Sequence, residues 1–215
     1  MKPKDLDREI ANCISEAARA HSRCPFIREE ELKWFLSYLI CRRIETNVER
    51  EARSQLTYVT DDDGKLVPAT DPVPGRRRSY GRIDIEIPRV PEETFHGAAI
   101  EVKFPRGPNQ DDYLPGNLRR DLQKLSDEDP QTRKFFVGFI EHKHKAAFMT
   151  GIRRCLEANL TLGISWCGLF FDDDLYVDSI EAEPPSFLET LRILIKSQGV
   201  LSSSECPESQ GSIGL

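Results

Sequence analysis

The segment RKFFVGFIE (residues 133–141) constrains the fold more than any other stretch of this 215-residue chain. It is short and almost continuously apolar, which is typical of a strand that is buried on both faces of a sheet. Such a strand needs helices above and below it. The apolar segment GISWCGLFF (163–171) predicts another strand. The chain is therefore expected to build a layered fold around these two segments.

Helical and extended patterns alternate through the rest of the chain. Apolar residues at helical spacing predict helices over 4–20, 28–45, 118–125, 148–160 and 185–198, with Asn117 as the N-cap of the third. The segments 47–60, 65–67 and 175–182 predict further strands, the last at a sheet edge. This order predicts an α/β fold with a central mixed β-sheet flanked by helices, and Trp34 and Trp166 are expected in its core. We divide the chain into an N-terminal helical segment (1–25), a domain (26–200) and a disordered tail (201–215).

Composition narrows the functional classes. No stretch approaches the roughly 18 apolar residues of a membrane span, so no membrane partner is expected. The charged start MKPKDLDREIANC lacks the apolar run of a secretory signal, which favours a cytoplasmic location. Six scattered cysteines without a CxxC pair favour reduced thiols over a zinc site. The net charge of −6 leaves room for local basic clusters.

The segments GRIDIEIP (81–88) and AAIEVKF (98–104) predict two amphipathic strands joined by a short connection. Side chains alternate between the two faces of a strand. If the strands pair with their aliphatic faces aligned, Ile83, Ile85 and Ile87 share one face. The opposite face then gathers four charged residues, namely Asp84, Glu86, Glu101 and Lys103.

This grouping has a chemical and a structural interpretation. Carboxylates on neighbouring strands supply the oxygen ligands that Mg²⁺ prefers, and Mg²⁺ needs only one or two of them. Such a metal polarises a phosphoryl oxygen and acidifies a bound water, and a lysine beside it can orient that water. Cross-strand pairs of glutamate and lysine also occur in ordinary half-exposed hairpins. The two strands alone leave both interpretations open.

An Asp on one strand followed by Glu101-Val102-Lys103 on the next resembles the PD-(D/E)xK, or restriction-endonuclease-like, nuclease superfamily. The resemblance extends over about residues 28–145, through the order helix, strand region, motif hairpin, helix and buried strand. No Pro precedes Asp84, unlike the strictest family pattern. The resemblance implies a nuclease that cuts DNA with Mg²⁺ or Mn²⁺, an endonuclease rather than an exonuclease, in restriction, defence or repair. Asp84 and Glu101 would bind the metal, and Lys103 would position or activate water.

The same resemblance adds a glutamate from the first core helix, and Glu31 is the candidate, with Glu30, Glu45 and Glu49 as alternatives. It also implies a Gln or Lys of the helix LRRDLQKL near the site, for which we select Gln123. Phosphate contacts are expected from basic side chains, namely Arg76, Arg77, Arg78, Arg82 and Arg119. We expect Asp121 on a helix surface, and His142 and His144 at an exposed strand end. The expected partners are DNA, a second copy in a homodimer, and a protein of a defence or repair system. The alternative is an inactive nuclease-like domain that binds DNA or assembles with proteins.

Overall fold

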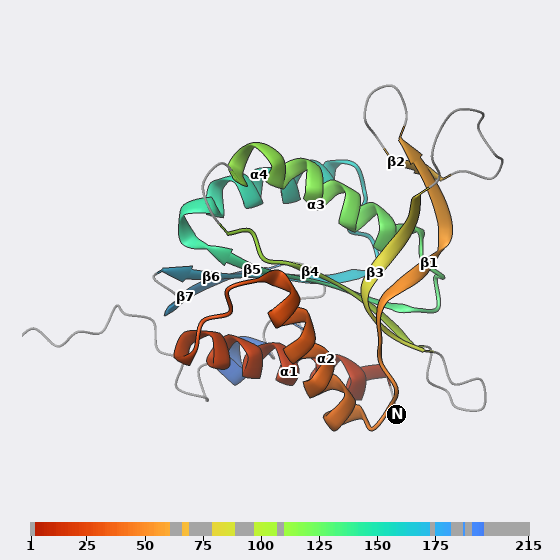
Figure 1. Cartoon of the computed structure of the whole chain (residues 1–215). Helices are drawn as coiled ribbons and strands as arrows, with labels where there is room; N and C mark the ends of the chain where they lie inside the picture. The colour runs from red at the N-terminus through yellow and green to blue at the C-terminus, as the bar shows by residue number, and fades with distance from the viewer. Residues whose placement is uncertain are drawn as a thin grey trace, which may run out of the picture.

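The computed structural model describes residues 3–60, 66–68, 79–88, 97–106, 110–172, 175–181, 187 and 191–195. These residues form an α/β fold in which two layers of helices enclose one mixed β-sheet (Figure 1). The expected tail over 201–215 and the arginines Arg76, Arg77 and Arg78 lie outside the described residues.

The sheet has seven strands in the order β2-β1-β3-β4-β5-β6-β7. Strands β1 (Glu49–Thr60), β2 (Leu66–Pro68), β3 (Ser79–Ile87) and β4 (Ala98–Lys103) pair antiparallel. Strands β4, β5 (Arg133–Glu141) and β6 (Ile164–Asp172) are parallel, and β7 (Leu175–Glu181) adds an antiparallel edge. The apolar segment 133–141 is indeed a central strand buried on both faces.

Helices α1 (Pro3–Arg23) and α2 (Glu29–Ile44) cover one face of the sheet, below it in Figure 1. They share one core cluster with sheet residues such as Ile100, Val137 and Leu169 and with Phe187, Leu191 and Ile195. The side chains of α1, which lies before the division at residue 25, thus pack into the same core as those of α2. Within α2 the apolar residues Leu32, Leu36, Leu39 and Ile40 are buried.

Helices α3 (Gln110–Asp127) and α4 (Lys145–Glu157) cover the opposite face. Leu114, Leu118 and Leu122 of α3 pack with Phe148 and Ile152 of α4 in a second core cluster. Our expectation that this helix starts after Asn117 is wrong, because α3 begins at Gln110 and contains Pro115. A proline inside a helix removes one backbone hydrogen bond. Leu114 and Leu118, on either side of Pro115, are both buried, and burial of such side chains favours the helical conformation here.

Gly138 of β5 and Gly168 of β6 are partners in the parallel ladder. The ring of Phe148 on α4 lies directly over both. A Cβ built at Gly138 would lie 2.9 Å from Cε2 of that ring, and one at Gly168 would lie 2.7 Å from Cε1. Since real Cβ atoms do not approach so closely, the two glycines allow α4 to pack against the middle of the sheet.

Three sequence-based expectations about single residues are wrong. Trp34 is 61% exposed on α2, although we expected it in the core, whereas Trp166 is buried as expected. The segment after β5 is not an exposed strand end but a 3-10 helix (His142–His144), in which His144 is buried and its Nδ1 lies 2.8 Å from Asp111 Oδ1. Asp121 of α3 is buried rather than on the helix surface. In each case the tertiary contacts of the side chain, and not the local pattern, decide its exposure.

Candidate active site

The predicted hairpin forms, and its two strands separate at the motif residues. The antiparallel ladder between β3 and β4 pairs Ile87 with Ala98, Glu86 with Ala99 and Ile85 with Ile100. Beyond this pair the backbone ladder ends, and a side chain makes the next hydrogen bond between the two strands. Asp84 Oδ2 accepts the backbone N–H of Val102 at 2.8 Å. Asp84 and Glu101 are 7% and 1% exposed, so the two carboxylates are buried where the strands diverge.

The backbone is irregular at this point, which changes the face that Ile83 meets. Ile85 packs toward α1 and α2, whereas Ile83 packs with the α3 and α4 cluster, so our expectation of a shared face is wrong for Ile83. On the neighbouring strand β1, Glu51 has a φ of 52°, in the left-handed region. Non-glycine residues occupy that region at a cost, and such costs are concentrated at functional sites. The irregularity places Asp84 between the two helical layers.

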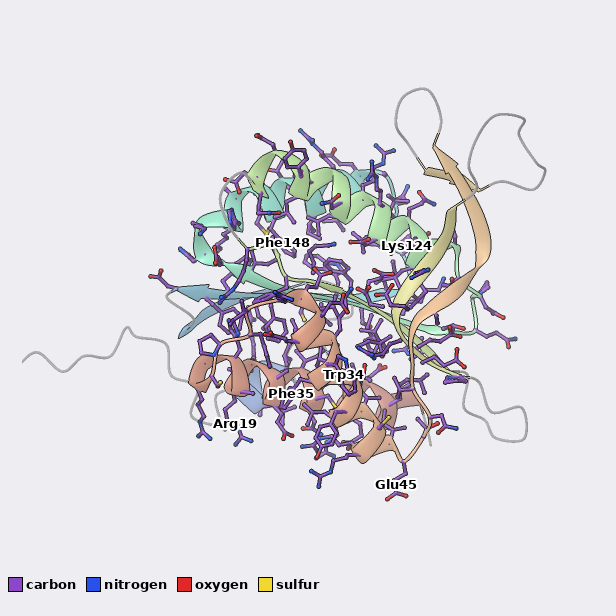
Figure 2. All side chains as sticks on the ribbon, in the orientation of Figure 1. Arg19, Trp34, Phe35, Glu45, Lys124 and Phe148 are labelled. Carbon is purple, nitrogen blue, oxygen red and sulfur yellow. The ribbon has the colours of Figure 1, made fainter. Side chains whose placement is uncertain are left out.

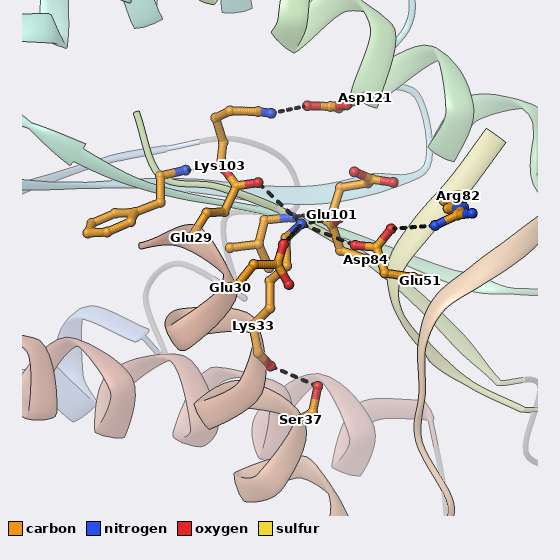
Figure 3. A network of polar contacts seen from close by, with 12 residues as sticks. Glu29, Glu30, Lys33, Ser37, Glu51, Arg82, Asp84, Glu101, Lys103 and Asp121 are labelled. Atoms are coloured by element: carbon orange, nitrogen blue, oxygen red, sulfur yellow. Dashed lines mark hydrogen bonds and ion pairs between the residues drawn. The ribbon is translucent and has the colours of Figure 1, made fainter. Parts of the chain in front are cut away.

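Lys33 of α2 neutralises Asp84 from below the sheet (Figure 3). Its Nζ lies 2.8 Å from Asp84 Oδ1, and its side chain is only 8% exposed. The same Nζ lies 3.2 Å from Glu29 Oε1, 3.2 Å from Glu30 Oε1 and 3.3 Å from Glu51 Oε1. Burial works against the charged form, but these carboxylates outweigh it and raise the pKa of Lys33. Lys33 is therefore a permanent cation at the centre of four acids.

Helix α3 supplies the counterpart above the sheet. Lys124 Nζ lies 2.7 Å from Glu101 Oε1 and 3.2 Å from Asp121 Oδ1. Lys103 Nζ lies 2.7 Å from Asp121 Oδ2 (Figure 3). Asp121, which we expected on the helix surface, is thus the acid that orients the motif lysine. These contacts give each motif residue a charged partner within the described part of the chain.

The pKa of Glu101 is raised well above its ordinary value of 4.5. Burial is the main cause, followed by the negative charges of Asp84 and Asp121, and Lys124 compensates only in part. The pKa of Lys103 is also raised, because Asp121 and Glu29 outweigh the effect of its burial. A buried carboxyl beside two other acids has more negative potential around it than its lysine relieves, so a further cation would be stabilised there.

Helix α2 brings Glu29 to the site, and Glu30 through its contact with Lys33, whereas Glu31 lies elsewhere. Glu29 Oε2 accepts the backbone N–H of Phe104 at 3.0 Å, immediately after Lys103, and Glu29 Oε1 pairs with Lys33. Glu31 instead folds back over the helix start, where its Oε2 accepts the N–H of Ile27 at 2.7 Å and of Arg28 at 3.3 Å. This is the second half of a capping box, so Glu31 serves the helix terminus. Glu45 is the C-cap of α2, at the opposite end of the helix from Glu29.

The structure separates the other candidates. Gln123 donates to Asp127 Oδ1 at 2.9 Å, away from the motif, and its neighbour Lys124 takes the position that we expected for Gln123. Glu86 is not part of the cluster: it pairs with Ala99 and Glu49 across the sheet, and burial and the charges of Glu128 and Glu49 raise its pKa.

Of the proposed phosphate-binding side chains, Arg82 and Arg119 are exposed. Arg82 lies beside the cluster: its carbonyl accepts Lys124 Nζ at 2.9 Å, and its Nη1 is 4.0 Å from Glu51 Oε2. Sequence reasoning therefore missed Glu29, Lys33 and Glu51. The spacing of Glu29 and Lys33, four residues apart on one helix, is the signal that could have pointed to that pair.

Comparisons with protein-family models, curated proteins and solved structures find no match for this chain. Among the described residues no helix is both long and apolar enough to cross a membrane. A cavity of about 290 Å³ lies between α1 and α2, lined by Glu16, Leu39, Arg42 and Arg43, and contains none of the motif residues. A function for this chain therefore has to be inferred from the site itself.

The donor atoms of the site suit a hard divalent cation. No three His, Cys, Asp or Glu side chains of the described residues form a metal-binding group. Asp84 and Glu101 offer two carboxylates on rigid strands, which is the number that Mg²⁺ requires when water and phosphate complete its shell. Asp84 Oδ1 and Glu101 Oε1 are engaged by lysines. A metal held by this pair would share the two carboxylates with Lys33 and Lys124.

Proposed function

We propose that this chain is a metal-dependent nuclease that hydrolyses phosphodiester bonds in DNA. The observation that carries the proposal is that the charge of Asp84 acts on both Glu101 and Lys103 where β3 and β4 separate, and that each of the three has an ion-pair partner. The order α2, β1, β3, β4, α3, β5 is also the order that the resemblance to the restriction-endonuclease-like superfamily implies. Both features support an endonuclease core.

Each residue of the site then has a role. Asp84 and Glu101 would hold Mg²⁺ or Mn²⁺, which supplies Lewis-acid polarisation of the phosphate and acidification of water. Lys103 has a raised pKa and is an ammonium at neutral pH, so it donates hydrogen bonds to water or to a phosphate oxygen. Asp121 holds that ammonium in place, and Glu29 fixes the backbone at Phe104. Lys33 and Lys124 would offset part of the charge of the carboxylates.

One observation favours a second function. Asp84 and Glu101 each already have a lysine partner, which occupies one oxygen of the carboxylate that a metal would bind. The alternative is therefore a nuclease-like domain without catalysis that binds DNA or assembles with other proteins. We also propose, from the resemblance alone, that the chain forms a homodimer and has a protein partner in defence or repair.

Cleavage of supercoiled and linear DNA in Mg²⁺ or Mn²⁺ tests the proposal. The variants Asp84→Asn, Glu101→Gln and Lys103→Ala should abolish cleavage, whereas Glu86→Gln, on the same strand as Asp84 but outside the cluster, should retain it. Metal-dependent cleavage with this pattern supports the nuclease. Salt-sensitive DNA binding without cleavage by the wild type supports the inactive module, and cleavage that survives all three substitutions contradicts the assigned site.

A further inference from the structure

A line of exposed residues runs along α2 beside the candidate active site. Trp34 is 61% exposed and Tyr38 is 49% exposed, and both rings lie on one side of the helix with Arg42, because they are spaced at intervals of four residues. Arg50, at the start of β1, reaches the same line from the neighbouring strand. We call Trp34, Tyr38, Arg42 and Arg50 the α2 aromatic stripe. Large exposed aromatic rings that lie together mark a surface for a ligand or partner.

A guanidinium group lies over each aromatic ring of the stripe. The guanidinium of Arg50 lies 4.3 Å from the centre of the Trp34 ring, and that of Arg42 lies 5.7 Å from the centre of the Tyr38 ring. Arg42 also donates to Tyr38 Oη at 3.1 Å. Neither arginine has a carboxylate partner among the residues that the structure describes. By contrast, the adjacent Arg43 pairs with Glu9 and Glu16.

The stripe is continuous with the site. Trp34 follows Lys33 in the chain, and Arg50 precedes Glu51. Lys33 Nζ and Glu51 Oε1 are 3.3 Å apart, and the same Nζ contacts Asp84 (Figure 3). Trp34 (labelled in Figure 2) and Arg50 are therefore chain neighbours of two residues in the charged cluster. Glu30, which would repel an anion at this end, is paired with Lys33 at 3.2 Å. The exposed face of α2 that begins at Trp34 thus adjoins the cluster around Lys33.

We propose that the α2 aromatic stripe binds an unpaired strand of DNA next to the site, an inference that rests on the proposed nuclease function. Aromatic rings stack on bases, and guanidinium groups bind phosphates and stack on rings. Trp34 and Tyr38 are separated by about 6 Å along the helix axis, given a rise of 1.5 Å per residue. A duplex hides the faces of its bases, so only a single strand presents both bases and phosphates to these residues. The substrate is thus a DNA with a single-stranded segment.

Tryptophan fluorescence tests the proposal without requiring cleavage. The chain has two tryptophans, Trp34 exposed and Trp166 buried, so a single-stranded oligo(dT) added in EDTA should quench the emission of Trp34 alone. In the variant Trp34→Phe, which leaves only Trp166, the quenching should disappear while binding persists. Trp34→Ala should weaken oligo(dT) binding by about 5-fold to 150-fold, the range of one lost stacking contact. Tyr113→Ala, which removes an exposed ring on α3, is the matched control and should bind normally.

An abasic oligonucleotide of the same length separates stacking from charge. The abasic oligonucleotide keeps every phosphate but has no bases, so it should bind wild type and Trp34→Ala with equal affinity. Arg50→Ala should weaken the binding of both oligo(dT) and the abasic oligonucleotide. Equal affinity of wild type and Trp34→Ala for oligo(dT), or a change of oligomeric state in Trp34→Ala, would overturn the proposal in favour of a protein interface.

The outcomes for stripe and site are distinguishable. If the chain cleaves duplex DNA but Trp34→Ala does not affect oligo(dT) binding, the proposal for the stripe is contradicted and the proposed nuclease function is supported. If oligo(dT) binding depends on the stripe but the chain does not cleave DNA, the proposal for the stripe is supported and the chain is a DNA-binding module without catalysis.

Discussion

The ammonium of Lys33 on α2 lies 2.8 Å from Oδ1 of Asp84 on β3, and both side chains are nearly buried. Lys124 holds Glu101 from α3, in the opposite helical layer. The two motif carboxylates are therefore paired with cations from opposite helical layers. Charge compensation at this site depends on contacts among α2, β3, β4 and α3.

We predict that Lys33→Met lowers the free energy of unfolding by about 3–5 kcal/mol, because it leaves a buried carboxylate unpaired. Urea unfolding of the metal-free chain measures the effect. The double variant Lys33→Met/Asp84→Asn should recover part of the loss, since it also removes the stranded charge. Lys143→Met, which changes an exposed lysine, should stay within about 0.5 kcal/mol of wild type. No recovery in the double variant would show that the pair is not the source of the loss.

Glu29 and Glu31 should respond in opposite ways to alanine substitution. Glu29→Ala should reduce DNA cleavage about 10-fold to 100-fold, the usual effect of losing a group that orients a metal site. Glu31→Ala should leave cleavage unchanged and lower the free energy of unfolding by about 1 kcal/mol, because it removes the capping contacts to Ile27 and Arg28. Paired cleavage and unfolding assays measure both. If Glu31→Ala loses cleavage but keeps its stability, Glu31 would be a residue of the active site and not of the helix cap.

Glu45 closes α2 with a φ of 55°, and its N–H donates to Cys41 O at 3.1 Å. Glycine has no Cβ to strain in this conformation, so Glu45→Gly should stabilise the chain by about 1 kcal/mol. For a chain of this length that corresponds to a rise in Tm of about 2–4 °C in a calorimetric scan. Glu45→Ala keeps the Cβ and should bring no gain. A gain of equal size in both variants would assign the effect to the lost charge instead.

Burial raises the pKa of the Cys167 thiol from 9.0 to about 12. Between these values the folded chain holds a proton that the unfolded chain releases, so the contribution of this thiol to stability is complete below pH 9 and is lost as the pH rises. Stability should fall by up to about 1.4 kcal/mol per pH unit from this group. In Cys167→Ala, the curve of unfolding free energy against pH should be flatter above pH 9. Urea unfolding under reducing conditions measures both slopes, and parallel curves would contradict the assignment.

Local patterns in the sequence account for much of the fold. The strands β3, β4, β5 and β6 follow from alternation or from continuous apolar runs, which depend on residues close together in the chain. Alternation also places Asp84, Glu101 and Lys103 among the charged residues of the hairpin, whereas their role as a motif rests on the resemblance alone. The start of α3 does not, because Pro115 and Gly116 are typical of a turn and only contacts with α4 make the helix longer.

The charged shell of the site could not be predicted from local patterns. The three glutamates before Lys33 indicate only a favourable interaction with the positive end of the helix dipole. Nothing in that segment shows that Asp84 and Glu51, which lie on two different strands, both contact Lys33. Asp121 sits among exposed charges in the sequence and becomes buried because Lys103 and Lys124 converge on it. Trp34 shows the reverse, since its apolar side chain suggests a core position that Leu32 and Leu36 already fill.

The close approach of Phe148 to Gly138 and Gly168 also constrains how sequences of this fold can diverge. A methyl group at either glycine would meet the ring within 3 Å, so a side chain at either position requires the ring at position 148 to shift or to be replaced by a smaller group. A homologue with alanine at either glycine position is expected to carry a smaller residue than phenylalanine at position 148. Such covariation among three positions would locate the centre of the parallel strands in distant homologues from their sequences alone.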